Sequence, residues 1–197
     1  MQLGEARLGL DAPPGFADTG FTGSPRLQEI AESLTSASNK ILLFAISDGD
    51  LRRFMQGDTP EFRRYMIAVT PRGLEYERVN ASAFANLVAD SLRELGKPPA
   101  EANYVSYLDS QPPGKAHLLA ELRKDADVVS VLQGARAPSQ RRNEPSQYLL
   151  STTTLMLLRG KALNLAVYTL YENPADVEWI RATTSRWIEA LQRLNNR

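Results

Sequence analysis

Cysteine is absent from this chain of 197 residues, and histidine occurs once, as His117. The lack of thiols excludes a disulfide scaffold, a cysteine nucleophile and a zinc ribbon. A single imidazole also excludes any site that needs two histidine ligands. The sequence contains neither G-x-G-x-x-G nor G-x-x-x-x-G-K-[ST], the glycine-rich patterns that hold dinucleotides and phosphates. We therefore expect no metal site and no cofactor.

Net charge is also absent, because 23 Lys and Arg residues balance 23 Asp and Glu residues. A dedicated binder of nucleic acid or of an anionic membrane carries an excess of positive charge. The most apolar stretch, 155–170, is interrupted by Arg159, Lys161 and Asn164 and falls short of the roughly 20 apolar residues that a membrane helix needs. We expect no nucleic-acid partner and no transmembrane segment.

The first residues, 1–7, include Glu5 and lack the basic and long apolar regions of a signal peptide. A starting Met can also stand where a leader has been removed. The expected location is therefore periplasmic or secreted if a leader was removed, and cytoplasmic otherwise.

The composition is that of a globular protein, with 43% hydrophobic and 23% charged residues. At roughly 150 residues per domain, the length predicts a single globular domain over residues 1–197. Helices are predicted after three capping positions, Ser24 (followed by Pro25), Asn80 and Asn173. Each of these positions precedes apolar residues at helical spacing.

Strands are indicated by alternating or continuous apolar residues bounded by turn residues. The segments concerned are 3–10, 41–46, 65–70, 116–122, 128–132, 148–158 and 162–171. The last two are the longest, and the connector Arg159-Gly160-Lys161 suits a tight antiparallel hairpin. The predicted class is α+β, with a single antiparallel-rich sheet and helices packed against it.

Several residue groups could carry chemistry, and each has a structural interpretation that we favour. His117 has no G-x-S-x-G nucleophile to serve and reads as a structural or surface histidine. Asp48-Gly49-Asp50 lacks the later ligands of a calcium loop, so we interpret Ser47 and Asp50 as a helix cap. The basic doublets 52–53 and 63–64 are interleaved with carboxylates, which favours ion pairs over anion binding.

Exposed aromatic and arginine side chains are the side chains most often found at protein interfaces. Tyr104 and Tyr107 lie between two double-proline breaks, Arg141 and Arg142 lie in a polar loop, and Trp179 lies off the apolar stripe of the last helix. These five residues are the predicted partner-binding residues.

The order of elements resembles the PsbP/DcrB/Mog-like fold group, an α/β/α sandwich. The residues that carry the resemblance are 12–16 (Ala-Pro-Pro-Gly-Phe), the following helix, the hairpin from 151–153 to 167–169, and Trp187-Ile188 in a closing helix. The chain also resembles a broad set of bacterial envelope proteins that begin with a short strand and a Pro-Gly-Phe turn. The resemblance implies a non-enzymatic assembly, accessory or binding role, and in one bacterial branch a chaperone for secreted effectors. It carries over no catalytic residue.

The leading functional expectation is a non-enzymatic extracytoplasmic accessory or protein-binding domain. It would hold a protein or envelope partner on the sheet face or on the loops around Tyr104 and Arg141. Two alternatives stay open. One is a cytoplasmic chaperone for a secreted effector, which predicts an exposed apolar groove, and the other is a hydrolase that uses carboxylates with His117.

Overall fold

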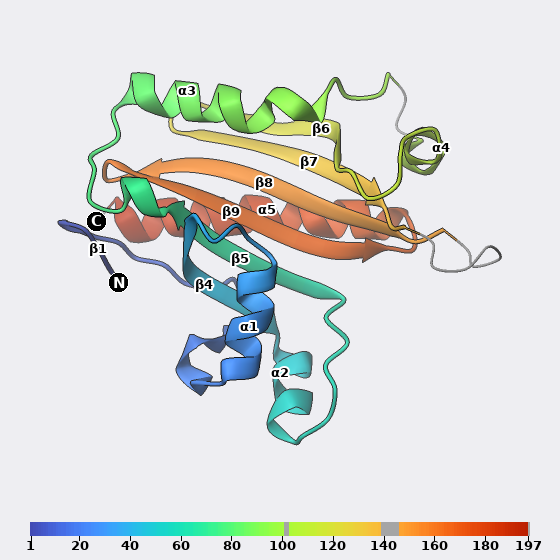
Figure 1. Cartoon of the computed structure of the whole chain (residues 1–197), viewed down its shortest axis with the longest axis horizontal. Helices are drawn as coiled ribbons and strands as arrows, with labels where there is room; N and C mark the ends of the chain where they lie inside the picture. Colours follow the sequence, from blue (N-terminus) through green and yellow to red (C-terminus); the bar gives the residue numbers. More distant parts are fainter. Residues whose placement is uncertain (101–102, 139–145, 197) are drawn as a thin grey trace.

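The computed structural model describes residues 1–100, 103–138 and 146–196. A seven-stranded sheet runs through it in the order β3-β4-β5-β9-β8-β7-β6, and every neighbouring pair is antiparallel (Figure 1). The strands are β3 (Phe16–Asp18), β4 (Asn39–Ser47), β5 (Arg64–Pro71), β6 (His117–Lys124), β7 (Val128–Arg136), β8 (Tyr148–Leu158) and β9 (Lys161–Tyr171). The predicted α+β class with an antiparallel sheet is confirmed.

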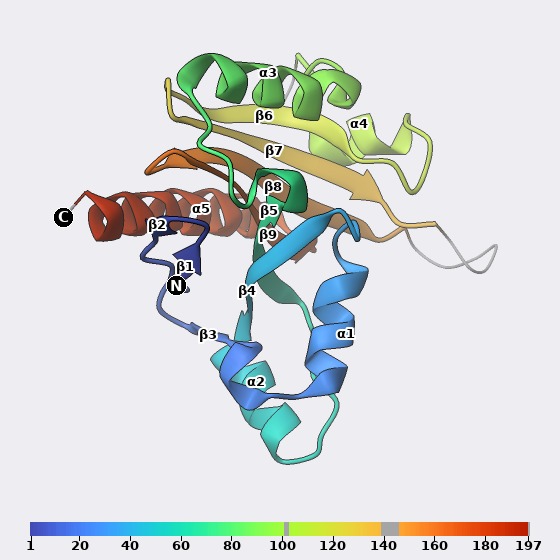
Figure 2. The same cartoon turned by 60° about the vertical axis from the view of Figure 1, so that its left-hand side comes forward.

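Helices cover both faces of the sheet. They are α1 (Pro25–Ser33), α2 (Asp48–Met55), α3 (Ala81–Leu92), α4 (Tyr104–Asp109) and α5 (Pro174–Asn195), with short 3-10 turns η1 (Thr19–Thr22), η2 (Arg72–Leu74) and η3 (Arg93–Leu95). The α5 helix lies along β8 and β9 on one face, where α4 also packs. The other face carries α1 and α2 over β4 and β5 (Figure 2). On this face α3 packs through Phe84 against Leu155 of β8 and Ala162 of β9. The arrangement is an α/β/α sandwich.

The hairpin of β8 and β9 forms as predicted. Its register ends at the pair Leu158 and Lys161, so the turn consists of Arg159 (φ 50°) and Gly160 (φ 76°). Positive φ at both central residues is the geometry of the type I′ turn, which matches the twist of the flanking strands. Thr152 and Thr154 are buried under α5, while Thr153 lies on the opposite face of the sheet. Thr152, Thr153 and Thr154 are therefore residues of strand β8 and not the lining of a pocket.

The predicted helix caps are confirmed. The Ser24 hydroxyl accepts from the N–H of Leu27 at 3.4 Å, and the Asn80 amide oxygen accepts from that of Ala83 at 2.9 Å. Asn173 and Asp176 form a reciprocal capping box. The Ser47 hydroxyl likewise accepts from the N–H of Asp50 at 3.0 Å, so Asp48-Gly49-Asp50 is the first turn of α2.

The predicted strand over 3–10 is wrong. These residues instead form the two-stranded hairpin of β1 (Gln2–Leu3) and β2 (Ala6–Arg7), which turns at Gly4 with φ of 54°. Leu8 and Leu10 contact the same core, as the alternation indicated, and Leu3 joins them there because the chain turns between Leu3 and Ala6. An apolar alternation alone does not distinguish one strand from a short hairpin, and the positive φ of Gly4 decides between them.

Two elements were not predicted. β3 has three residues and pairs only with the end of β4, and α4 has six residues between the double-proline breaks. Asn103 caps α4 by accepting from the N–H of Ser106 at 3.2 Å. Across the described ranges, no helix has both the length and the apolar character that crossing a bilayer requires.

Candidate binding groove at the β4 edge

The outer edge of β4 is only partly covered. β3 pairs with Ala45, Ile46 and Ser47, and among the described residues no strand pairs with this side of residues 39–44. Such an edge presents backbone N–H and C=O groups that another extended chain can pair with. The candidate binding site lies along these six residues.

The chain leaves the sheet edge at Thr19, directly after β3. The Thr19 hydroxyl donates to the carbonyl oxygen of Phe44 at 3.0 Å, in a buried position. This bond satisfies one edge carbonyl of β4, and η1 then carries the backbone away from the sheet. The line of β3 is therefore continued beyond Asp18 by a groove and not by backbone.

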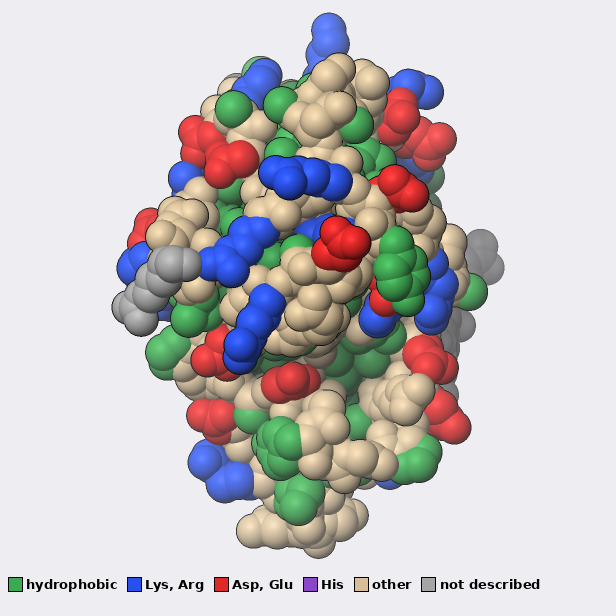
Figure 3. All heavy atoms as spheres, turned by 90° about the vertical axis from the view of Figure 1, so that its left-hand side faces the viewer, with side chains coloured by type: hydrophobic (Ala, Val, Ile, Leu, Met, Phe, Trp, Pro, Cys, Tyr) green, Lys and Arg blue, Asp and Glu red, His purple; other side chains and the backbone are tan. Residues whose placement is uncertain are grey.

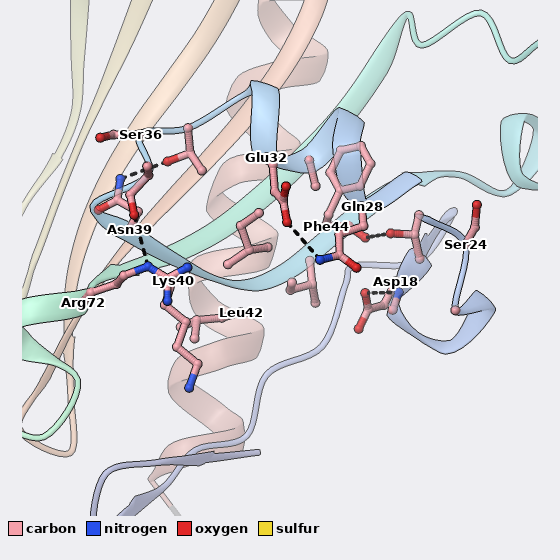
Figure 4. A pocket seen from close by; sticks show the side chains of 18 residues that line it. Asp18, Ser24, Gln28, Glu32, Ser36, Asn39, Lys40, Leu42, Phe44 and Arg72 are labelled. Carbon is pink, nitrogen blue, oxygen red and sulfur yellow. Dashed lines mark hydrogen bonds between the residues drawn. The ribbon is translucent and has the colours of Figure 1, made fainter. Parts of the chain in front are cut away.

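The groove has a volume of about 870 Å³ and lies between α1 and the edge of β4 (Figure 4). One wall comes from η1 and α1, the floor from the first six residues of β4, and one end from η2. The lining residues are Asp18, Thr19, Gly20, Gly23, Ser24, Gln28, Ala31, Glu32, Thr35, Ser36, Ala37, Asn39, Lys40, Ile41, Leu42, Leu43, Phe44 and Arg72. None of these residues was predicted from the sequence to bind a partner.

The groove has acidic and basic ends. Asp18 lies at the Phe44 end, and Lys40 and Arg72 lie at the Asn39 end, with Glu32 on the α1 wall between them (Figure 4). Lys40 forms an ion pair with Glu75. The side chain of Arg72 is exposed, and its Nε donates to the carbonyl of Ala37 at 3.1 Å. Among the described residues, neither Arg72 nor Glu32 has an ion-pair partner. The Glu32 carboxylate accepts a hydrogen bond from the Gln28 amide at 2.9 Å. Both charges can therefore meet a ligand.

A bulge interrupts β4 inside the groove. The register with β5 passes from Ile41 to Leu43, so Leu42 is an extra residue without a partner in β5. Its side chain packs against the core on the α5 side of the sheet. Bulges and lysines are devices that keep an exposed edge from pairing indiscriminately. The bulge and Lys40 therefore restrict which extended segments can pair with this edge.

The predicted partner-binding residues lie elsewhere. Tyr104 and Tyr107 are half-buried on α4 and pack on the main core, and the Tyr107 ring meets the ring of His117 edge-on at 6.3 Å. Trp179 is half-buried beside Phe16, with the Arg64 guanidinium 4.1 Å from its ring centroid. Arg141 and Arg142 lie outside the described residues. The tyrosines thus contact the β6 side of the sheet and Trp179 the β3 side, so the structure does not bring them together.

His117 is half-buried, as its structural interpretation requires. Burial, followed by the nearby charge of Lys115, lowers the pKa of its imidazole. The Nε2 atom is shielded from solvent and has no hydrogen-bond partner in the part of the chain that the structure describes. A hydrolase built on His117 remains a prediction that this geometry does not support, because a general base needs a group that orients it.

Three of the four arginines in the basic doublets form ion pairs, as predicted, and Arg52 has no ion-pair partner among the described residues. Arg53 pairs with Glu61 at 2.5 Å, Arg63 pairs with Glu172, and Arg64 pairs with Asp176 at 3.0 Å. On the molecular face that carries both termini, basic and acidic side chains are likewise interspersed (Figure 3). On this face the two signs of charge are therefore mixed.

The lowered pKa of Asp176 makes the stability of the fold depend on pH. Burial alone would raise the pKa of its carboxyl group, but the N–H groups of Glu172 and Asn173 donate to it and Arg64 lies beside it, so its pKa falls below the usual value. A carboxyl group with a depressed native pKa stabilises the fold above its unfolded pKa of about 3.9, and this contribution is lost as the pH falls through the native pKa.

Asp176→Asn should therefore lower the urea midpoint at pH 7, and the difference from the parent should narrow as the pH is lowered to 3. Urea unfolding at several pH values measures this. Glu178→Gln removes an exposed carboxylate from the same helix and serves as the control. Parallel pH profiles for the parent and Asp176→Asn would contradict the assignment.

No protein-family model and no curated protein matches the sequence of this chain. Among solved structures, the chain is similar to the Ran-binding protein Mog1p of Saccharomyces cerevisiae. The similarity has a TM-score of 0.41 and 12% sequence identity, and it covers 93% of this chain and 86% of that chain. Mog1p bears the name of the fold group that the sequence resembles.

Proposed function

We propose that this protein is a non-enzymatic protein-binding module that takes an extended segment of a partner protein along the free edge of β4. The observation that carries the proposal is the edge over residues 39–44, which lies in line with β3 and is walled by α1. Strand addition of this kind takes its affinity from backbone hydrogen bonds and its specificity from alternate side chains.

We expect the bound segment to have a defined length and direction. Six residues of strand extend over about 20 Å. Because β3 is antiparallel to β4 and runs toward the groove, a segment that continues its line also runs antiparallel to β4. Its N-terminal end then lies near Asp18 and its C-terminal end near Lys40 and Arg72.

Charge complementarity defines the chemistry of the segment. The exposed Arg72 favours an acidic residue in the C-terminal half of the segment, and Glu32 favours a basic residue nearer its middle. Apolar residues between them can pack against Leu42 and Ile41, which are half-buried. The expected ligand is an extended peptide with alternating apolar residues and this order of charges.

Selection from a displayed library of random ten-residue peptides on the full chain tests the proposal. Enriched peptides should share an acidic residue in their C-terminal half. On Arg72→Glu, the preference at that position should change to basic. Arg26→Glu reverses an exposed charge on α1 outside the groove and should select the same peptides as the parent.

Amide hydrogen exchange locates the binding. A bound enriched peptide should slow exchange at the amides of residues 40–44 more than at any other strand edge. Failure to enrich any shared pattern, or protection that falls on another part of the molecule, would contradict the proposal.

The resemblance to bacterial envelope proteins supports an extracytoplasmic accessory role as a further part of the proposal. Crosslinking in the native cell, followed by capture from separate periplasmic and cytoplasmic fractions, tests that location. Recovery of the protein with partners only in the cytoplasmic fraction would instead favour the chaperone alternative.

A further inference from the structure

A second cavity lies between β6 and α5, at the opposite edge of the sheet from the β4 groove. Its volume is about 280 Å³. This is the space of a small molecule or of one terminal group. The lining residues are Glu121, Leu122, Arg123, Ser130, Arg181, Thr184, Ser185 and Ile188.

Arg181 lines this cavity and is half-buried. In the part of the chain that the structure describes, its Nε atom is shielded from solvent and has no hydrogen bond, and no carboxylate lies within ion-pair distance of its guanidinium. Withdrawing an N–H donor from water without an acceptor costs free energy, and a guanidinium carries five such donors. An arginine of this kind at the wall of a cavity is therefore suited to bind an anion from solution.

The other charges at the cavity are already neutralised. Arg123 pairs with Asp125 at 2.5 Å, and Glu121 lies 3.8 Å from Lys124. On the helix side, the hydroxyl of Ser185 donates to Glu189 at 3.3 Å. The positive charge of Arg181 is therefore the one that the cavity leaves without a counter-charge among the residues the structure describes.

Two hydroxyl pairs form the buried wall of the cavity. Ser130 lies 2.7 Å from the hydroxyl of Thr154, and Thr184 lies 3.0 Å from that of Thr152. Ser130 and Thr184 line the cavity but are only 0% and 2% exposed, so their hydroxyls bond within the protein. Arg181 is therefore the unpaired polar group that the cavity offers among the described residues.

We propose that this cavity binds a small oxyanion, the carboxylate or phosphate group of a small molecule, with the Arg181 guanidinium as its counter-charge. Arginine matches such groups because its planar fork can donate two parallel hydrogen bonds to them. The proposal is independent of the β4 groove, so groove variants leave this binding intact.

Thermal unfolding of the full chain with increasing sodium phosphate or sodium succinate tests the proposal, with sodium chloride at matched ionic strength as the reference. A ligand that binds only the native state raises the Tm in a saturable way. We expect such a rise with at least one of the two anions, and the one with the tighter binding identifies the group as phosphate or carboxylate.

Variants at the cavity make the test specific. Arg181→Met keeps the length of the side chain. It should weaken the binding of the anion at least tenfold without lowering the Tm of the free protein. Arg181→Lys keeps the charge without the fork and should retain intermediate binding, which also preserves the test if Arg181→Met folds poorly. Arg186→Met, an exposed position on the same helix, should bind as the parent does.

Three results would overturn the proposal. They are no saturable rise with either anion, an equal rise with sodium chloride, and an anion affinity in Arg181→Met and Arg181→Lys equal to that of the parent.

Discussion

Trp187→Ala is expected to lower the free energy of unfolding by about 3–5 kcal/mol. The Trp187 side chain is 1% exposed at the centre of the core between α5 and the sheet. Its indole N–H donates to the carbonyl of Asp11 at 2.8 Å, which fixes the N-terminal segment on α5. The substitution leaves a cavity and removes this bond. Urea unfolding followed by circular dichroism measures the loss.

Two further variants separate the contributions. Trp187→Phe keeps an aromatic ring in the core but loses the hydrogen bond, so it should cost less than Trp187→Ala. Trp179→Ala removes a half-buried indole and its contact with Arg64, a cation–π contact worth about 0.5–1 kcal/mol at an exposed site. A cost for Trp187→Ala no larger than that of Trp179→Ala would show that the N-terminal segment does not dock in solution as described.

The parts of the fold that the sequence predicted depend on neighbours in the chain. Ser24, Asn80 and Asn173 each accept a hydrogen bond from an N–H two or three residues later, so the capping residue and its partner are visible in the same short stretch. The β8–β9 hairpin depends in the same way on two turn residues and on alternation in its strands. Local patterns of this kind specify elements but not the order of strands in a sheet.

The groove could not be predicted because it results from strand order. Nothing in the sequence places Arg72 beside Ala37, or indicates that β3 ends before it reaches the first residues of β4. The three residues of β3 are too few for a periodic signal. The bulge at Leu42 also has no sequence signature, since Ile41 to Ile46 reads as an uninterrupted buried strand.

The residue types common at protein interfaces predict binding residues that differ from those of the β4 groove. Tyr104, Tyr107 and Trp179 are of these types, and each is half-buried against the core. Amphipathic aromatic side chains are suited both to interfaces and to the margins of a core. Without tertiary contacts the two roles cannot be separated, and the partner-binding role of these residues remains a prediction.

Leu42→Pro is expected to weaken the peptides selected on the β4 groove by tenfold or more, which corresponds to about 1.4 kcal/mol. Proline removes the backbone N–H and fixes φ, and in sheets it is tolerated mainly at edges and bulges. Leu42 is such a position, because it lies at the sheet edge and has no register partner in β5. We expect the β4–β5 pairing to tolerate proline at this bulge, while the proline ring hinders pairing with an added strand. Fluorescence anisotropy with a labelled peptide measures the affinity, and circular dichroism checks the fold.

Leu42→Ala is the matched control, because it shortens the same side chain but keeps the N–H. If the bound segment is held by its backbone, Leu42→Ala should retain most of the affinity that Leu42→Pro loses. Equal affinities for two folded variants would instead mean that the groove recognises side chains alone, and the strand-addition mode would be wrong. The difference between the two substitutions thus measures the contribution of the edge itself, which no substitution of a charged groove residue can isolate.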